Sequence, residues 1–435
     1  MKTLLKAAPF KVDITPPVGH PITYGINRKV DTPIYLRGIG LNDGKGRFVL
    51  AVADVIGISG RSHQALTRLI AKTAGCRPSN VLLHAVHQHD SVCIGRDTDR
   101  LVSNAGFQPN VTNEYWSQLT HVVSRHIDAA LRPRKWKTVR RVETAERRVR
   151  NLAANRRLLG PDNKVTAMRF SMCGDPHLRK EPVGTIDPFL RTVCFTGPKG
   201  RKIAALHFYA THPQVAYHRN KIGGDVPGYA LGVVEKHTED PNTIHLYFSG
   251  CGANVTFGKH TDGSKKENLT KLSRRLGREI LSNMTCLEPK ETGPVCCKRS
   301  RFDLPIQKGI SERKLTDELQ NAETEAAAFY AARKLLALQR LKRRMKPMIQ
   351  RMDIGPDVSL LSFPSETVVE YQLYAQSLIP DRFLACAAYR DYSWFYLPTA
   401  EMYKQGGYEP SRGMYTPKLE KNIRGCIDTL LADLR

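Results

Sequence analysis

A strand–helix–strand pattern near the N-terminus constrains the fold of this chain more than any other feature. Residues 48–54 form an apolar run of strand length, and residues 61–74 follow with an apolar face of helical period that Gly75 should end. Residues 81–86 form a second apolar run. A helical crossover of this kind normally joins parallel strands of one sheet. The pattern therefore predicts a βαβ unit.

The same order of elements returns later in the chain. Residues 203–210 are typical of a buried strand, a helix is expected near residues 227–236, and residues 244–248 form another apolar strand. The two units predict an α/β fold with mixed β-sheets flanked by helices. We expect a layered α/β sandwich built from two βαβ-type halves.

Further elements are expected outside these units. Residues 113–131 and 311–346 have amphipathic helical periodicity, and residues 358–363 and 383–388 are typical of strands. No linker or low-complexity segment separates them. The chain is therefore predicted to be one domain over residues 1–435, with the long helix 311–346 as an internal excursion.

Charge and composition narrow the possible partners. The chain carries 67 Lys and Arg against 41 Asp and Glu, a net charge of +26, and 41% of its residues are hydrophobic, which excludes a disordered chain. A basic surface can meet an anionic membrane or nucleic acid, or it can simply be solvated. The basic residues are dispersed along the sequence, which makes nucleic acid an unlikely partner and leaves an anionic membrane surface open.

The expected compartment follows from the N-terminus and the cysteines. Residues 1–9 are too interrupted to form the apolar part of a signal peptide, and no run approaches the 18 or so apolar residues of a membrane span. The ten cysteines include no C-x-x-C pair and are expected to be free thiols. We therefore expect a cytoplasmic protein.

Residues suited to chemistry stand just after the predicted strands. In open α/β sheets, functional residues gather at the carboxyl ends of the strands. These ends carry His87 and His89, then His212, then Asn254 and Thr256, and finally Glu366. Two imidazoles and a carboxylate would suit Zn²⁺, although paired loop histidines can also be plain polar surface. His84, which lies inside an apolar strand, is expected to be a core histidine.

The remaining motifs concern the histidine pair, one glycine-containing turn, and the enzyme classes whose signature motifs are absent. The pair His87 and His89 would point to one side of an extended segment, so one could bind metal while the other handles a proton. The turn at residues 250–254 contains two glycines and could turn backbone N–H groups toward a ligand. The sequence has no G-x-S-x-G elbow, no P-loop and no dinucleotide fingerprint.

Taken together, the motifs resemble those of the catalytic, N-terminal domain of the neutral/alkaline non-lysosomal ceramidases. The opening V-D-I-T-P-P, A-V-H-Q-H-D, N-R, G-D-V-P-G-Y-A and P-S-E appear in the family's order, at residues 12–17, 85–90, 155–156, 224–230 and 364–366. Near the C-terminus, Tyr396, Thr399, Tyr403 and the pair Tyr408-Glu409 fall at the family's spacing, with Glu401 one residue out of step.

The resemblance implies a zinc-dependent amidohydrolase of the N-acylsphingosine amidohydrolase type. Its zinc ligands would be His87, His212, Glu366 and Tyr396, while His89 and Arg156 would face the reacting amide with Tyr408 nearby. The family's proposed serine nucleophile corresponds here to Thr256, and Phe257 follows it in place of proline. That replacement favours zinc-bound hydroxide as the nucleophile attacking an N-acyl amide.

The resemblance also leaves alternatives open. The family continues into an immunoglobulin-like domain and carries a secretory signal, and neither is expected here. The substrate could be ceramide or a smaller, more polar amide. One alternative is a non-catalytic protein of the same fold that binds metal or ligand. Another is a basic protein whose net charge of +26 binds anionic membrane or nucleic acid.

Overall fold

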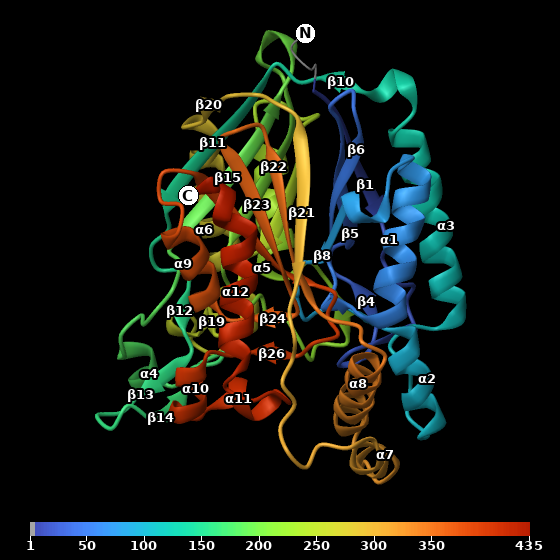
Figure 1. Ribbon diagram of the computed structural model, residues 1–435, viewed down its shortest axis with the longest axis vertical. Coiled ribbons are helices and arrows are strands. Elements are labelled where there is room, and N and C mark those ends of the chain that lie inside the picture. The colour runs from blue at the N-terminus through green and yellow to red at the C-terminus, as the bar shows by residue number, and fades with distance from the viewer. Residues whose placement is uncertain (1–4) are drawn as a thin grey trace.

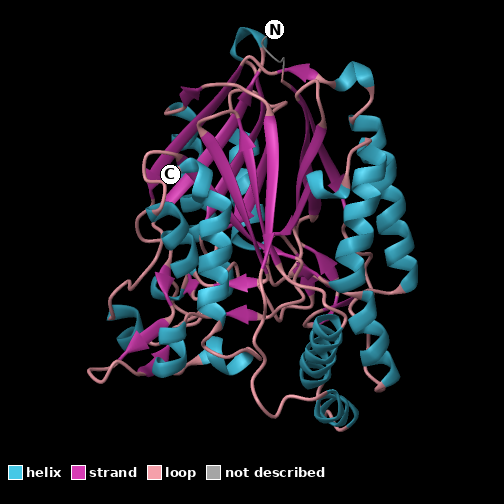
Figure 2. Ribbon diagram, viewed as in Figure 1, coloured by secondary structure: helices cyan, strands magenta, loops and turns pink. Residues whose placement is uncertain are grey.

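Two β-sheets lie face to face in the centre of the molecule (Figures 1 and 2). The structure is a computed structural model that describes residues 5–435; residues 1–4, part of the N-terminal stretch considered above, lie outside the described residues. The nine-stranded sheet has the order β10 (Lys137–Thr138), β1 (Lys6–Asp13), β5 (Tyr35–Asn42), β6 (Arg47–Ala53), β8 (Val81–Ala85), β25 (Phe383–Arg390), β23 (Val358–Pro364), β22 (Met348–Ile354) and β21 (Val295–Arg301). The five-stranded sheet has the order β18 (Ile244–Ser249), β16 (Lys202–Tyr209), β15 (Phe189–Thr196), β11 (Arg141–Arg148) and β20 (Glu288–Lys290).

Both predicted βαβ units are present, one in each sheet. Strands β6 and β8 pair in parallel and are connected through α1 (Gly60–Ala74), which Gly75 ends in the left-handed conformation at φ 64°. Strands β16 and β18 also pair in parallel, and α5 (Asp225–His237) connects them. The predicted halves are therefore confirmed, and each contributes to a different sheet.

Helices cover the outer faces of the sheets and complete a sandwich of four layers. Helices α1, α3 (Asn113–Ala130) and α12 (Leu419–Leu431) pack on the nine-stranded sheet, and α5 and α6 (Lys265–Thr285) pack on the five-stranded sheet (Figure 1). The predicted α/β sandwich, with mixed sheets flanked by helices, is confirmed.

The packing explains why the strands read as unbroken apolar runs. In β6, Val49 and Ala51 face the helices, while Leu50 and Val52 face the other sheet. All four side chains are at most 2% exposed. A strand that is buried on both faces has no polar alternation.

The predicted helix at residues 311–346 is wrong in one respect, because it is two helices. Helices α7 (Glu312–Gln320) and α8 (Glu325–Lys342) are separated by a break in which Thr324 is extended and its hydroxyl accepts from the Ala327 N–H at 3.2 Å. This N-cap starts a new helix. The chain folds back there, so that Leu315 of α7 packs against Leu335 and Leu338 of α8.

Several elements were not predicted, notably β1, β5, β11, β15, β21 and β22, and helix α6. The remaining helices are α2 (Arg96–Asn104), α4 (Pro176–Lys180), α9 (Val369–Ser377), α10 (Ala400–Gln405) and α11 (Tyr408–Arg412). The short strand pairs are β2 (Pro21–Ile22) with β3 (Gly25–Ile26), β4 (Lys29–Val30) with β17 (Lys221–Ile222), β7 (Gly57–Ile58) with β9 (Cys93–Ile94), β12 (Ala154–Asn155) with β19 (Val255–Thr256), β13 (Arg157–Leu159) with β14 (Val165–Met168), and β24 (Glu366–Thr367) with β26 (Tyr396–Leu397).

Two smaller expectations are met in the described chain. All ten cysteines are free thiols. His84 is a core histidine, with Nδ1 2.8 Å from the Ala388 carbonyl oxygen and Nε2 2.9 Å from the Ser362 hydroxyl.

Among residues 5–435, no helix combines the length and the apolar character needed to cross a bilayer.

Candidate metal centre and active site

Three histidines from two sheets converge beyond the ends of their strands. His87 and His89 follow β8, and His212 follows β16. The Nε2 atoms of His212 and His89 lie 3.0 Å apart, those of His212 and His87 3.2 Å, and those of His87 and His89 3.4 Å. We call these three residues the histidine cluster. Because their ring nitrogens point at one another, the cluster could hold a metal ion.

The pair His87 and His89 converges by a different route from the one predicted. His87 is not extended but has a φ of 67°. Ser365, Tyr389 and Phe395 also adopt positive φ values, of 45°, 62° and 54°. Such backbone is uncommon outside glycine and is held only where the surroundings fix it. These four residues lie in turns beside the cluster, and other positive-φ residues occur elsewhere in the described chain.

The neighbours of His87 and His89 assign them opposite tautomers. Nδ1 of His87 lies 2.7 Å from the Ile56 carbonyl oxygen, which can only accept, so the proton sits on Nδ1 and Nε2 keeps its lone pair. Nδ1 of His89 lies 3.3 Å from the Gln214 amide nitrogen, which can only donate, and 3.0 Å from the Tyr24 hydroxyl. The proton of His89 therefore sits on Nε2. Nε2 of His87 therefore offers a lone pair that could bind a cation, and the Nε2–H of His89 points at the same space.

Burial keeps the cluster neutral. His87 is fully buried, and His212 and His89 are 2% and 8% exposed. Desolvation lowers the pKa of His87 to about 3 and holds the pKa values of His89 and His212 well below the usual 6.5. Neutral imidazole is the form that binds a metal.

Glu366 adds a carboxylate beside the cluster. Its Oε2 lies 3.7 Å from Nε2 of His87 and has no hydrogen-bond partner, while its Oε1 accepts from the Tyr392 hydroxyl at 2.6 Å. Burial raises the pKa of Glu366, and the phenols of Tyr392 and Tyr396 oppose that rise. A buried carboxylate oxygen without a partner is costly, and a cation would satisfy it.

Tyr396 stands next to Glu366 because their two short strands pair in parallel. Glu366 of β24 and Tyr396 of β26 are register partners. The four residues expected to bind zinc therefore lie in one region, with two imidazoles, a carboxylate and a phenol as donors. This donor set fits Zn²⁺.

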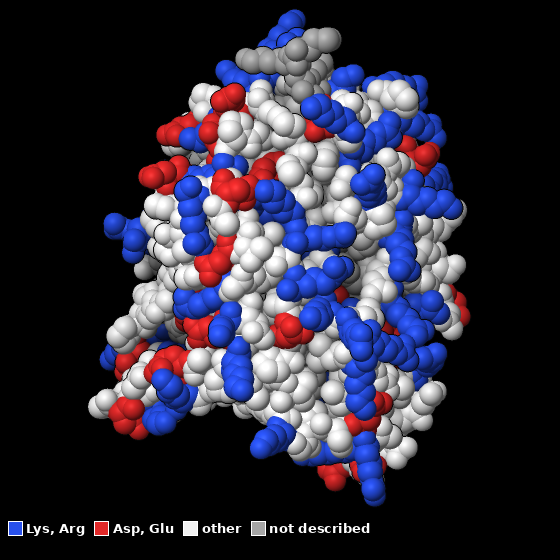
Figure 3. Space-filling model, in the orientation of Figure 1, with Lys and Arg blue, Asp and Glu red and all other residues white. Residues whose placement is uncertain are grey.

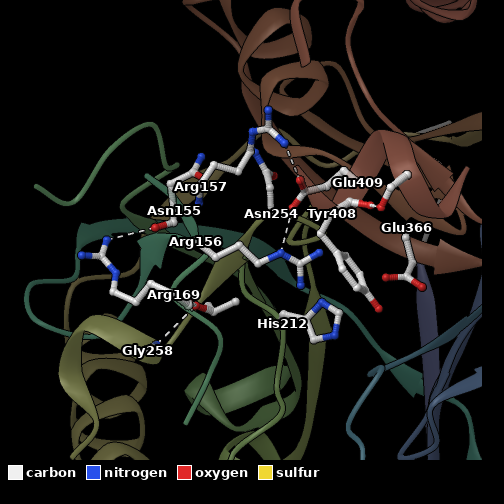
Figure 4. A network of polar contacts seen from close by, with 12 residues as sticks. Asn155, Arg156, Arg157, Arg169, His212, Asn254, Gly258, Glu366, Tyr408 and Glu409 are labelled. Atoms are coloured by element: carbon white, nitrogen blue, oxygen red, sulfur yellow. Dashed lines mark hydrogen bonds and ion pairs between the residues drawn. The ribbon is translucent and has the colours of Figure 1, made fainter. Parts of the chain in front are cut away.

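Arg156 reaches the same region from the opposite side. Its Nε donates to Glu409 at 2.8 Å, and Arg157 Nη1 donates to the other oxygen of Glu409 at 2.5 Å. The Nη2 atom of Arg156 is buried without a partner. Figure 4 shows that the free end of the guanidinium points to the space between His212 and Tyr408. A buried, unpartnered N–H of this kind is suited to an oxyanion.

Solved structures share the architecture of this chain. No family model matches the chain, and no curated protein matches it. A crystal structure of neutral ceramidase from Pseudomonas aeruginosa superposes on the whole chain and on 75% of its own, with a TM-score of 0.73 and 17% sequence identity. This chain has the neutral ceramidase fold. A ceramidase complexed with C2 gives the same result, with a TM-score of 0.72, 18% identity, and coverage of 99% of this chain and 75% of that one.

Within this ceramidase fold, the Thr256 hydroxyl is already engaged. It donates to the Arg169 carbonyl oxygen at 2.9 Å and accepts from the Gly258 N–H at 3.3 Å. The backbone of Thr256 forms a bridge with His212, whose own N–H donates to Val255 at 2.7 Å. Thr256 therefore supports the loop that carries His212.

Tyr408 lies against the other candidate residues. Its ring centroid is 5.5 Å from that of Tyr396, and the Arg156 guanidinium carbon lies 4.9 Å from it. Its hydroxyl is 3.4 Å from that of Tyr330. The predicted catalytic residues His89, Arg156 and Tyr408 thus surround the same space as the predicted ligands.

Four residues of the candidate site were not predicted from the sequence: Tyr24, Gln214, Tyr389 and Tyr392. Glu409 was noted only as part of the C-terminal motif, without a role. Tyr389 stacks on His87 with ring centroids 4.1 Å apart. The only signal for Tyr389 and Tyr392 was the aromatic-rich stretch of residues 389–408. Nothing in the sequence distinguished Tyr24 or Gln214, since they meet His89 only in the folded chain.

Proposed function

We propose that this protein is a zinc-dependent amide hydrolase that cleaves an N-acyl amide, with lipid amides such as ceramide as the substrate class. The observation that carries the proposal is the convergence of the histidine cluster with the unpartnered oxygen of Glu366. The shared fold with neutral ceramidase supports a hydrolase of this class. His87, His212, Glu366 and Tyr396 would hold the zinc.

Zinc, when bound, would polarise the amide carbonyl and make water acidic enough to react near neutral pH. The protein's own residues would do the rest. Arg156, anchored by Glu409, would donate its free Nη2–H to the carbonyl oxygen as negative charge develops there. Water adds to the carbonyl carbon, the carbon–nitrogen bond breaks, and the amine leaves with one proton more.

His89 would relay that proton: it takes up the proton that the attacking water gives off and returns one to the departing nitrogen. Its Nε2 carries hydrogen and points into the cluster, while Tyr24 and Gln214 hold its Nδ1 from behind. His89 is also the most exposed of the three histidines, which suits a group that meets substrate. This division of labour gives His87 to the metal and His89 to the amide.

The test is hydrolysis of a short-chain ceramide and of a small polar N-acyl amide by zinc-loaded and chelator-treated protein. We expect zinc-dependent release of amine from at least one of the two. Their relative kcat/KM values decide between a lipid and a polar substrate. Stoichiometric zinc without turnover of either amide would contradict the proposal and favour a non-catalytic binding protein.

A further inference from the structure

The exposed large apolar side chains of this protein are confined to two short segments. Among residues 5–435 they are Val18 (66% exposed) and Ile26 (39%) in one segment, and Leu159 (47%), Phe170 (41%) and Val183 (37%) in the other. Single exposed apolar residues are ordinary on a protein surface. Their restriction to residues 18–26 and 159–183 is unusual, because the rest of residues 5–435 carries no exposed large apolar side chain.

Both segments also supply residues to the candidate site. The first segment holds Tyr24, whose hydroxyl lies 3.0 Å from His89. In the second, the Phe170 ring lies 5.5 Å from the Tyr408 ring and is contacted by the Arg156 guanidinium. The apolar side chains therefore lie on the segments that flank the reacting amide.

The second segment is also built to stand away from the core. Strands β13 and β14 pair only with each other. Every residue of β14 is partly or fully exposed. Figure 1 shows these strands and α4 projecting at the lower end of the molecule, below the two sheets. Isolated two-stranded pairs bury little apolar surface of their own.

Positive charge accompanies the apolar side chains of the first segment, whereas the second segment carries both signs, with Asp162, Asp175 and Glu181 among its residues. Arg28 and Lys29 follow Ile26 after the buried Asn27, both are exposed, and neither forms an ion pair within the described chain. Residues 18–29 contain no acidic residue. Figure 3 shows that basic side chains are otherwise spread over the face it displays, with acidic ones between them. Apolar residues beside basic ones are typical of surfaces that lie in a lipid headgroup layer.

We propose that residues 18–26 and 159–183 form a docking rim that inserts into a lipid bilayer surface and holds the candidate site against it. The inference rests on the proposed function, because a lipid amide would then pass from the bilayer to the histidine cluster without crossing water. Val18, Ile26, Leu159 and Val183 enter the lipid, and Arg28 and Lys29 contact the phosphates.

The test is flotation of the full chain with phosphatidylcholine vesicles, with and without phosphatidylserine. Two rim variants are compared: Val18→Asp with Leu159→Asp, and the uncharged Val18→Ser with Leu159→Ser. The matched control, Ser117→Asp with Thr270→Asp, adds the same charge on α3 and α6. We expect the charged rim variant to lower the bound fraction about tenfold and the serine variant to lower it measurably, since both remove apolar contact.

Two readouts separate this proposal from the proposed function. The rim variants should hydrolyse a soluble short-chain amide like the wild type, and lose hydrolysis only of amide embedded in vesicles. Binding that survives in the rim variants as in the control, or that needs phosphatidylserine and vanishes in high salt, would overturn the docking rim. Vesicle binding that depends on the rim, without hydrolysis of any amide, would leave the rim standing and refute the proposed function.

Discussion

Arg156 and Glu409 are 253 residues apart in the chain and form a buried ion pair, with Nε 2.8 Å from Oε1. Neither side chain is more than 2% exposed. Glu409 also holds Arg157, and although burial opposes its charge, the two guanidiniums keep the pKa of Glu409 below its usual range. The pair holds the guanidinium of Arg156 with its free end toward the space between His212 and Tyr408.

Glu409→Gln should therefore impair both stability and hydrolysis. The change leaves two buried guanidiniums without a carboxylate, which costs roughly 3 kcal/mol of the free energy of unfolding. Arg156 loses its anchor, so kcat should fall more than KM rises, while zinc content stays unchanged. Urea unfolding, steady-state kinetics and elemental analysis measure the three effects.

The control for Glu409→Gln is Glu401→Gln. Glu401 is an exposed glutamate that pairs with Lys404, and its loss should change stability by less than about 0.5 kcal/mol. If Glu409→Gln hydrolysed the substrate like this control, the anchoring role of Glu409 would be wrong.

The tautomers of His87 and His89 predict different phenotypes. His87→Ala should lose both zinc and hydrolysis, because it removes a lone pair aimed at the metal. His89→Ala should keep about one zinc per molecule and lose hydrolysis, because it removes a proton donor. Elemental analysis and amide hydrolysis on the same preparations decide the matter. The reverse pattern, with metal lost only in His89→Ala, would exchange the two roles.

Tyr392→Phe should weaken the metal site without touching a ligand. The Tyr392 hydroxyl donates to Glu366 at 2.6 Å, and such outer contacts are typically worth a factor of about 10–100 in metal affinity. Competition with a chelator measures the affinity. Tyr374→Phe serves as the control, because it removes a hydroxyl bonded to Asp428. Equal zinc affinity in the two variants would exclude the contribution of Tyr392.

Thr256 separates a hydroxyl nucleophile from a supporting residue. Thr256→Ala should retain hydrolysis at about a tenth of the wild-type rate, a barrier change of roughly 1.4 kcal/mol. The segment that bridges His212 loses its hydrogen bonds to the Arg169 carbonyl and the Gly258 N–H. Thr256→Ser keeps the hydroxyl and should be near wild type. Steady-state kinetics test both. Mass spectrometry that trapped an acyl group on Thr256 would show that it is the nucleophile.

A second buried histidine pair, on the adjacent strands β16 and β18, should make stability depend on pH. Nε2 of His207 lies 3.0 Å from Nδ1 of His245, and burial lowers the pKa of His245 to about 4, with Glu235 opposing and Arg37 and Lys11 assisting. Below about pH 6.5 the His245 side chain binds a proton in the unfolded chain, whereas in the folded chain it stays neutral down to about pH 4. Stability should therefore fall as pH drops from about 6.5 to 4.

The contribution of His245 is measured by the slope of the free energy of unfolding against pH. His245→Asn should reduce the loss of unfolding free energy by up to about 1.4 kcal/mol per pH unit in that range, whereas His126→Asn, at an exposed position, should not change it. Urea unfolding at several pH values gives the slopes. Identical slopes for the wild type and His245→Asn would contradict the prediction.

The sequence predicted those elements whose burial in the fold demands a recognisable local pattern of residues. Residues 48–54 and 81–86 read as strands because burial on both faces demands apolar residues throughout, and the helix between them kept its period and its Gly75 stop. Strands such as β1 and β11 escaped notice because they contain charged or proline residues among the apolar ones. The break at Thr324 was missed because its cap is worth little more than the helix propensity around it.

For the site, the sequence by itself determined which chemistry-bearing residues follow strands. His87, His89, His212 and Glu366 were found in this way, and the motif resemblance added Arg156, Tyr396 and Tyr408. The tertiary structure decided how they meet. The distances between ring nitrogens depend on two sheets packed face to face, and the tautomers of His87 and His89 depend on Ile56 and Gln214, which no local pattern connects to them. Long-range contacts of this kind carry no period in the sequence. The local pattern therefore left the roles of the two histidines open, the resemblance implied a division between them, and the folded chain supplies the contacts with Ile56 and Gln214 from which that division is proposed.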